Sequence, residues 1–409
     1  MDSRVPGPYY RRWIQSFERT QTPGGTFSDE ATGQFGASVG MTKGFSLPAQ
    51  LTEELVPLGW RAALRSRLDQ LEYSASPSDL HIARVIGVQR TGLEVAPAVG
   101  AGNTHVPLSG RWFQGDALSR PTVGDWVVID KPTGSLLDML PRLSVIKRMS
   151  PSGGAQLIAA NVDTAFIVSA CNADYSPARI ERYLSVIMQA DIEPVIILTK
   201  ADLIGDADAF RDSVSREFPA VQSLVLNALD SEAVARLHGW CGQGQTIALL
   251  GSSGVGKSTL VNSLVGAQIQ LTQAVREGDE KGRHTTTNRS LHLLPQGGVI
   301  LDSPGMRELQ IADADAGLGQ VFEDIEDLAA HCKFNDCGHI SEPGCAVLAA
   351  IASGRVDARR VQHYRALRQE EVANRGALTE RRTRSRSPTK DRANRDGLSE
   401  SMGDGLDES

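Results

Sequence analysis

The stretch that decides the fold is TIALLGSSGVGKSTLVNSLV, which spans residues 246–265. Within it, residues 251–258 match G-x-x-x-x-G-K-[ST] at every fixed position, between an apolar strand pattern and a helical pattern, as that motif requires. The glycines let successive backbone N–H groups face phosphate oxygens, and the helix N-terminus adds its dipole. In such a loop Lys257 reaches the β and γ phosphates and the Ser258 hydroxyl binds Mg²⁺. We therefore expect nucleotide contacts from Gly251, Ser252, Ser253, Gly254, Val255, Gly256, Lys257, Ser258 and Thr259.

Short apolar runs on both sides of this stretch predict a parallel sheet. Helical patterns separate several of them, and strand alternating with helix is typical of an α/β domain whose sheet is covered on both faces. We expect this domain to span residues 153–310. The predicted strands are 163–170, 193–199, 223–228, 246–251 and 298–302, and the clearest helices are 180–189 and 258–265.

The remaining chain predicts several further units. Residues 1–57 lack periodic pattern and are expected to form a flexible leader. Residues 58–152 predict a helix over 58–71 and then a small β-barrel, either OB-fold-like or SH3-like, with strands at 81–88, 92–99, 111–113 and 124–130. Residues 311–372 predict a small helical domain. Residues 373–409 mix Arg with Ser and lack apolar content, so we expect a disordered tail.

Two segments downstream of the phosphate loop are expected to sense the γ phosphate. Asp302-Ser303-Pro304-Gly305 follows a buried strand, where the Asp302 carboxylate would hold Mg²⁺ through water and the Gly305 N–H would meet the γ phosphate. The run Gly282-Arg283-His284-Thr285-Thr286-Thr287 lies between the phosphate loop and Asp302. One of its threonines, Thr286 or alternatively Thr285, would coordinate Mg²⁺.

The identity of the base is expected to depend on Thr199-Lys200-Ala201-Asp202, at the end of a predicted strand. The Asp202 carboxylate would accept hydrogen bonds from guanine N1–H and the 2-amino group, whereas adenine would leave a charge unpaired. Lys200 would lie along the base, and Asn227-Ala228 would offer a backbone N–H to guanine O6. This guanine box precedes the phosphate loop, the reverse of the usual order, so we interpret the domain as circularly permuted.

The residue after Gly305 is Met306, whose thioether cannot orient the attacking water as a glutamine does in many GTPases. His284 is the nearest alternative by sequence, although it is equally well interpreted as a loop residue or an RNA contact. We therefore expect slow intrinsic hydrolysis that a partner accelerates.

A metal site is predicted by the pattern Cys332-x4-Cys337-x-His339-x5-Cys345. Three thiolates and one imidazole satisfy tetrahedral Zn²⁺ and leave no open position, so the one zinc ion per chain would be structural. Buried free cysteines, or His331 in place of His339, are the alternatives. Cys171 and Cys241 stand apart and are expected to be inert.

Taken together, TKAD, GSSGVGKS, GRHTTT, DSPG and C-x4-C-x-H-x5-C resemble the ribosome small-subunit-dependent GTPase A family (RsgA, also called YjeQ), as do ANVDTAFIVSA at 160–170 and CKFNDCGHISEPGCAV at 332–347. The resemblance covers roughly residues 58–371. It implies an OB-fold, a circularly permuted GTPase domain and a zinc domain that act on the small ribosomal subunit and its rRNA. Thr199 and Asn227 replace the commoner Asn and Ser, which bears on affinity more than on base choice.

Composition restricts the other classes of function. With 42 basic and 49 acidic residues the net charge is -7, which argues against charge-driven binding to nucleic acid except through a local patch. Nothing resembles a membrane span or a coiled coil, so we expect a cytoplasmic monomer. A small-molecule P-loop enzyme and a nucleotide-gated scaffold are the competing interpretations. The residues considered for an RNA patch are Arg142, Lys147, Arg148, Arg359, Arg360, Arg365 and Arg368.

Overall fold

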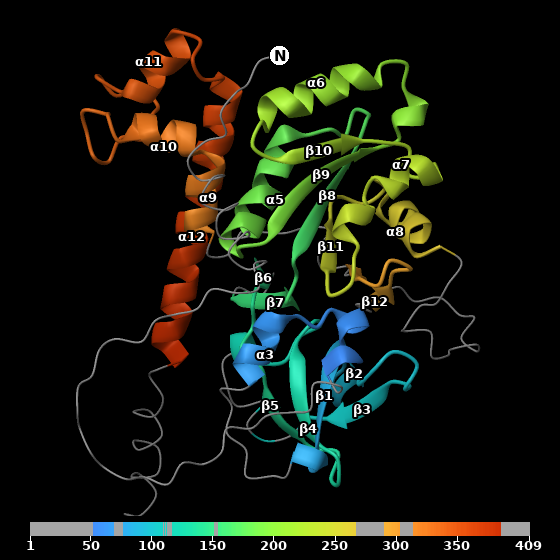
Figure 1. Cartoon of the computed structure of the whole chain (residues 1–409). Helices are drawn as coiled ribbons and strands as arrows, with labels where there is room; N and C mark the ends of the chain where they lie inside the picture. Colours follow the sequence, from blue (N-terminus) through green and yellow to red (C-terminus); the bar gives the residue numbers. More distant parts are fainter. Residues whose placement is uncertain are drawn as a thin grey trace, which may run out of the picture.

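The computed structural model describes residues 52–68, 77–108, 110, 112, 117–150, 154–266, 290–302 and 314–385. Along the chain, a five-stranded antiparallel sheet comes first, then a six-stranded, mostly parallel sheet with its helices, then a group of helices (Figure 1). None of the helices in the described part of the chain has the length and apolarity that a membrane crossing demands.

The first sheet has the order β3-β2-β1-β4-β5, and every neighbouring pair is antiparallel. Alternate residues of β1 pack into two apolar clusters: Val85 lies in the cluster on one face and Ile86 in the cluster on the other. The sheet is therefore buried on both sides over its centre. The strands are β1 Leu80–Val88, β2 Gly92–Ala96, β3 Thr104–Pro107, β4 Trp126–Asp130 and β5 Leu136–Met139.

Parts of the N-terminal prediction need correction. The expected helix is present but short, α3 Ala62–Leu68, with Leu64 and Leu68 buried. Leu55, within the expected leader, is 3% exposed because it packs into the main core. In the expected strand 111–113 only Trp112 is described, and it is not in a strand; it packs against the cluster that includes Val85.

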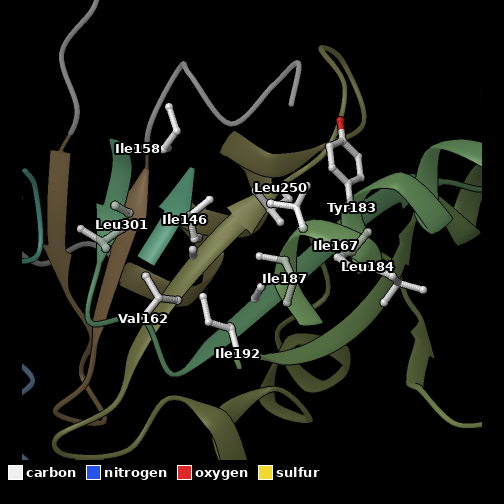
Figure 2. Packing of buried hydrophobic residues seen from close by; sticks show 14 of the residues in the cluster. Ile146, Ile158, Val162, Ile167, Tyr183, Leu184, Ile187, Ile192, Leu250 and Leu301 are labelled. Atoms are coloured by element: carbon white, nitrogen blue, oxygen red, sulfur yellow. The ribbon is translucent and has the colours of Figure 1, made fainter. Parts of the chain in front are cut away.

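A two-stranded antiparallel sheet follows, formed by β6 Val145–Met149 and β7 Ala155–Ala160. Neither segment was predicted as a strand from the sequence. Ile146 and Ile158 join the core that also receives β8 (Figure 2). This hairpin follows the first sheet along the chain and packs against the six-stranded sheet.

The second sheet contains all five strands that the sequence predicted for the α/β domain. Its order is β10-β9-β8-β11-β13-β12, with parallel pairing everywhere except between β12 and β13. Edge strand β12, Ser290–Leu293, was not predicted. The other strands are β8 Thr164–Ala170, β9 Glu193–Thr199, β10 Gln222–Val225, β11 Thr246–Leu250 and β13 Val299–Asp302.

Both faces of this sheet are buried, as long apolar runs in parallel strands require. Ile167 and Leu250 point into the cluster shared with α5, while Phe166 and Leu249 point into the opposite cluster, shared with α8 (Figure 2 shows the former). The covering helices are α5 Pro177–Gln189, α6 Ala207–Glu217, α7 Ser231–Ala235 and α8 Lys257–Val265.

Of the C-terminal helices, α9 and α12 pack against α5 (Figure 1). A Cβ atom at Gly317 would lie 1.9 Å from the Ser185 carbonyl oxygen, so only glycine allows the contact between α9 and α5. α12 continues to Ser385, into the segment assigned to a disordered tail, because extending an existing helix through good helix formers requires no new nucleation. The helices are α9 Asp315–Val321, α10 Glu323–Ala329, α11 Ala346–Ala352 and α12 Ala358–Ser385.

A buried arginine joins the antiparallel sheet to the parallel one. Arg84 of β1 is fully buried and donates hydrogen bonds to the Leu58 carbonyl, to Thr246 Oγ1 at 2.9 Å and to the Asn161 carbonyl at 3.2 Å. Its guanidinium also lies over the ring of Trp126, 5.3 Å from the centroid. Burial lowers the pKa of Arg84 to about 9. Since Thr246 begins β11, this joint reaches the strand that carries the phosphate loop.

Candidate functional site

The phosphate loop is built from the turn between β11 and α8. Gly251, Gly254 and Gly256 have φ values of 142°, 80° and 97°, a region that side-chain-bearing residues rarely adopt. A Cβ atom at Gly251 would also lie 2.2 Å from the Val168 carbonyl oxygen. Val255 is buried and anchors the loop, while Ser253 and Ser258 are exposed on it. The predicted strand, loop and helix are therefore all present.

Lys257 is the first residue of α8 and is only 9% exposed. Its ammonium donates to the Gly251 carbonyl at 2.7 Å and to the Ser252 carbonyl. These bonds hold the charge at the start of the loop. A nucleotide phosphate entering the loop would thus meet a cation that is already in place.

The guanine box lies against the phosphate loop. Thr199, the last residue of β9, is fully buried, and its hydroxyl contacts the Val255 carbonyl and the Ser169 carbonyl, the latter at 3.1 Å. A Cβ atom at Gly256 would meet Thr199 Oγ1 at 3.1 Å. Lys200 has a left-handed backbone, with φ of 61°, and Asp202 follows it in the exposed 3-10 helix Ala201–Leu203.

The loop after β10 lies at the same carboxyl end of the parallel strands. The Ala201 N–H donates to the Leu226 carbonyl at 3.4 Å, which joins this loop to the guanine box. Asn227 is half-buried, and its side-chain oxygen accepts from the Leu229 N–H at 2.9 Å. The Ala228 carbonyl accepts from Ser263 of α8 at 2.6 Å. These contacts place Asn227-Ala228 beside the other two segments.

The remaining nucleotide predictions lie at or beyond the limit of the described residues. Asp302 ends β13, the parallel neighbour of β11, so its backbone stands at the edge of the sheet that holds the phosphate loop. The other four predicted positions, His284, Thr285, Thr286 and Gly305, lie outside the described residues, as does Met306.

The four predicted metal ligands come together between α10 and α11. The ligand atoms of Cys332, Cys337, His339 and Cys345 lie within 4.8 Å of one another. His339 Nδ1 is 3.6 Å from the Cys332 sulfur and 3.4 Å from the Cys345 sulfur, and those two sulfurs are 3.8 Å apart. Such separations fit three thiolates and one imidazole around a tetrahedral ion at ~2.0–2.3 Å from each ligand.

His331, the alternative fourth ligand, is not part of this group. It is exposed, and its Nδ1 lies 2.8 Å from the Asp327 carbonyl oxygen in the preceding turn. Cys171 and Cys241 are buried elsewhere, and burial raises the pKa of their thiols to about 11 and about 12. Neither thiol is therefore poised to react or to bind a metal.

Two residues that contact the candidate sites were not predicted from the sequence. Arg179, in the first turn of α5, donates to the Ser252 hydroxyl at 2.7 Å. Glu342 organises the metal loop, since its carboxylate accepts from the N–H groups of Gly338, Ile340 and Ser341 at 2.7–2.9 Å. These backbone hydrogen bonds lower the pKa of Glu342 to about 2. Arg179 belongs to no motif, and Glu342 lies within residues 332–347 but is not a predicted ligand. Only the folded chain brings the two residues to their partners.

Several basic residues considered for an RNA patch are engaged within the protein. Arg142 pairs with Asp125 at 2.7 Å, and its side chain is 12% exposed. Arg142 is thus a structural residue rather than a surface cation. The same applies in part to α12, where the guanidinium groups of Arg359, Arg360 and Arg368 pair with carboxylates.

Comparison with known proteins agrees with this arrangement. The family model described as RsgA GTPase matches residues 139–312. A "Small ribosomal subunit biogenesis GTPase RsgA 2" from Vibrio parahaemolyticus is 45% identical over 334 residues, which cover 81% of this chain and 90% of the relative. A protein named "Small ribosomal subunit biogenesis GTPase RsgA" from Mesorhizobium japonicum is 44% identical over 327 residues, or 78% of this chain and 90% of its own.

The fold is also that of a solved structure. YjeQ from Thermotoga maritima superposes with a TM-score of 0.52 at 21% sequence identity, covering 71% of this chain and 98% of its own. These relatives favour neither a small-molecule enzyme nor a scaffold with incidental hydrolysis. The phosphate loop, the guanine box that precedes it in the chain and the extent of the sequence match lead to one conclusion: the chain belongs to the family of circularly permuted RsgA GTPases.

Proposed function

We propose that this protein binds the small ribosomal subunit in its GTP form and hydrolyses GTP during the late maturation of that subunit. The observation that carries the nucleotide half is the contact between Thr199 and Val255, which unites the guanine box with the phosphate loop. The ribosomal half is supported by the names of relatives that align over most of the chain. Action on ribosomal subunits would place the protein in the cytoplasm, and we propose a monomer.

Within the nucleotide site, each segment has a separate task. Backbone N–H groups of residues 251–256 and the ammonium of Lys257 would bind the phosphates. Asp202 would select guanine, with Lys200 along the base and Ala228 offering its N–H to O6. Mg²⁺ would be held by Ser258 and Thr286, and by Asp302 through water. Gly305 would bind the γ phosphate, and His284 would orient the attacking water when the subunit is bound.

The flanking modules would dock the GTPase domain onto the subunit. We propose that the five-stranded antiparallel sheet is an OB-fold-like barrel, a fold whose surface binds RNA. We also propose that Zn²⁺ occupies the group Cys332, Cys337, His339 and Cys345 and stiffens the C-terminal module. The ion would serve a structural role, because four protein ligands leave no position for a substrate.

Co-sedimentation with small ribosomal subunits tests the ribosomal half. The protein should pellet with the subunits in the presence of a non-hydrolysable GTP analogue and remain largely in the supernatant with GDP. Subunits should also raise the rate of GTP hydrolysis. If neither nucleotide state binds the subunits, the proposal is wrong.

A substitution at the base tests the nucleotide half separately. Asp202→Asn removes the carboxylate that two guanine donors need, so GTP affinity should fall steeply, by roughly a hundredfold or more. Asp206→Asn is a matched control, since Asp206 caps α6 and accepts from the Ala209 N–H at 3.0 Å. Competition between GTP and ATP provides the measurement, and unchanged GTP selectivity in Asp202→Asn would exclude the assigned base contact.

A further inference from the structure

A second cation lies beside the phosphate loop, contributed by a helix that belongs to no nucleotide motif. Arg179 stands in the first turn of α5, and its guanidinium donates to the Ser252 hydroxyl at 2.7 Å across a separation of 73 residues. Its side chain is half-buried. The backbone of α5 is fixed here by Pro177 at the helix start, so the arginine projects from a rigid element.

The position of Lys257 indicates which phosphate this arginine faces. In phosphate loops of this type the lysine reaches the β and γ phosphates. Here its ammonium lies over the carbonyls of Gly251 and Ser252, at the start of the loop. The terminal phosphates therefore belong on the same side as Ser252, whereas the α phosphate belongs nearer the beginning of α8. Arg179 is thus on the γ-phosphate side.

We propose that Arg179 is a positioning residue for the terminal phosphate of GTP, acting through Ser252. By holding the Ser252 hydroxyl it fixes the conformation of the loop where the γ phosphate binds. Its permanent positive charge also favours the more highly charged nucleotide. The inference rests on the proposed binding of GTP in this loop. It assigns to Arg179 a contribution to the preference for GTP over GDP, in addition to the one expected of Gly305 and Thr286.

Affinity for GTP and GDP, measured with fluorescent nucleotide analogues, tests this role. In Arg179→Ala the affinity for a non-hydrolysable GTP analogue should fall roughly tenfold, the usual effect of losing one charge-assisted hydrogen bond, while GDP affinity changes less than about twofold. The GTP affinity of Arg179→Lys should lie between those of the wild type and Arg179→Ala, because lysine keeps the charge but not the planar fork.

A double-mutant cycle with Ser252→Ala shows whether the arginine acts through the hydroxyl. The double variant should discriminate GTP from GDP no worse than Arg179→Ala alone, since both changes remove the same contact. Arg211→Ala is the matched control. Arg211 lies on the exposed surface of α6, where it pairs with Asp208, and its loss should leave both affinities unchanged.

Three outcomes would overturn the inference: unchanged GTP affinity in Arg179→Ala, equal losses for GTP and GDP, or strictly additive effects of the two substitutions. If Arg179→Ala does not fold, the ratio of GTP affinity to GDP affinity in Arg179→Lys and in Ser252→Ala decides the question. Wild-type protein that binds no GTP would instead contradict the proposed function. If the wild type binds GTP and Arg179→Ala binds both nucleotides as well as the wild type does, only the positioning role is contradicted.

Discussion

The hydroxyl of Thr199, at the end of β9, donates a hydrogen bond to the carbonyl of Val255 inside the phosphate loop. The two residues are 56 positions apart, and each belongs to a segment that would bind a different part of the nucleotide. A single buried contact therefore sets the spacing between the base site and the phosphate site. The contact is possible because Gly256, next to Val255, has no side chain to displace Thr199.

Thr199→Val tests this link, since it keeps the shape of the side chain and removes the hydroxyl. The carbonyls of Val255 and Ser169 would lose a buried donor, which we expect to weaken GTP and GDP binding alike, by about tenfold, and to lower stability by about 1–3 kcal/mol. Thr199→Ser keeps the hydroxyl and should behave like the wild type. Nucleotide titration together with urea unfolding measures both effects; normal affinity in Thr199→Val would contradict the link.

Arg84→Met is expected to loosen the joint between the two sheets. It removes three hydrogen bonds donated to Leu58, Thr246 and Asn161 and leaves their oxygens buried, at an expected cost of about 3 kcal/mol. Urea unfolding should then show the two domains unfolding at different concentrations. Arg148→Met provides the comparison, because Arg148 contacts Gln156 within one hairpin and should leave a single transition.

Zinc content distinguishes the two histidines of the C-terminal module. His339→Ala and Cys337→Ser should each reduce bound zinc from about one ion per chain to almost none, since four ligands close the site. His331→Ala should retain the metal, because His331 lies outside the group. Elemental analysis of the purified variants measures the metal, and a zinc-free His331→Ala protein would show that the ligand set is wrong.

Removing the metal should unfold a defined part of the chain. A chelator that strips the zinc should raise amide hydrogen exchange between Cys332 and Cys345, because this segment has little apolar surface of its own to keep it folded. The phosphate loop is formed by other elements and should keep its nucleotide. Loss of GTP binding on chelation would contradict this independence.

The contact between α5 and α12 predicts an unequal pair of substitutions. Glu181 of α5 is 2% exposed and is held by Arg360 at 2.9 Å and His363 at 2.8 Å. Arg360→Met would leave that buried carboxylate with His363 as its remaining partner and should cost about 3 kcal/mol. Glu181→Gln removes the charge, and Arg360 keeps a second partner in Asp324, so the cost should be nearer about 1 kcal/mol.

The same pair has a defined pH dependence. Burial raises the pKa of Glu181 above its ordinary value of 4.5, although Arg360 and His363 oppose this. As the pH rises from 4.5 through that raised pKa, the unfolded chain releases the proton first, so the contribution of Glu181 to stability falls. Arg360→Met removes a charge that opposes this rise, so the pKa of Glu181 is raised further in the variant. The variant therefore gains more stability than the wild type as the pH is lowered, and the difference in stability between them should shrink. A gap that is constant from pH 7 to pH 4 would contradict the assignment.

The sequence predicts the parallel sheet well because buried strands leave an unbroken apolar run, as in β9 and β11. Short strands at the edges carry no such signal. β3 is Thr-His-Val-Pro, with one buried residue, and its polar positions do not distinguish it from a loop. β12 alternates Leu with polar residues over four positions, too few for the period to be evident.

The residues of the candidate sites likewise divide into those that the sequence predicts and those that it does not. The glycines, Lys257 and the Cys/His group could be predicted because their chemistry requires particular residues at particular spacings. Arg179 and Glu342 could not, because an arginine or a glutamate is common on any surface and acquires its role from a neighbour that only the fold supplies. Arg142 shows the converse, since a basic residue predicted for the surface has a buried carboxylate as its partner.

The strand β11 is bonded at its first residue, Thr246, to Arg84 of the antiparallel sheet, and its last residue precedes Gly251. Its five residues cover about 17 Å of nearly inextensible backbone. A large partner that grips the N-terminal module and tilts it would pull directly on the base of this strand. Binding of that partner would then be transmitted to the nucleotide through β11 itself, with no hinge or flexible linker between the antiparallel sheet and the phosphate loop.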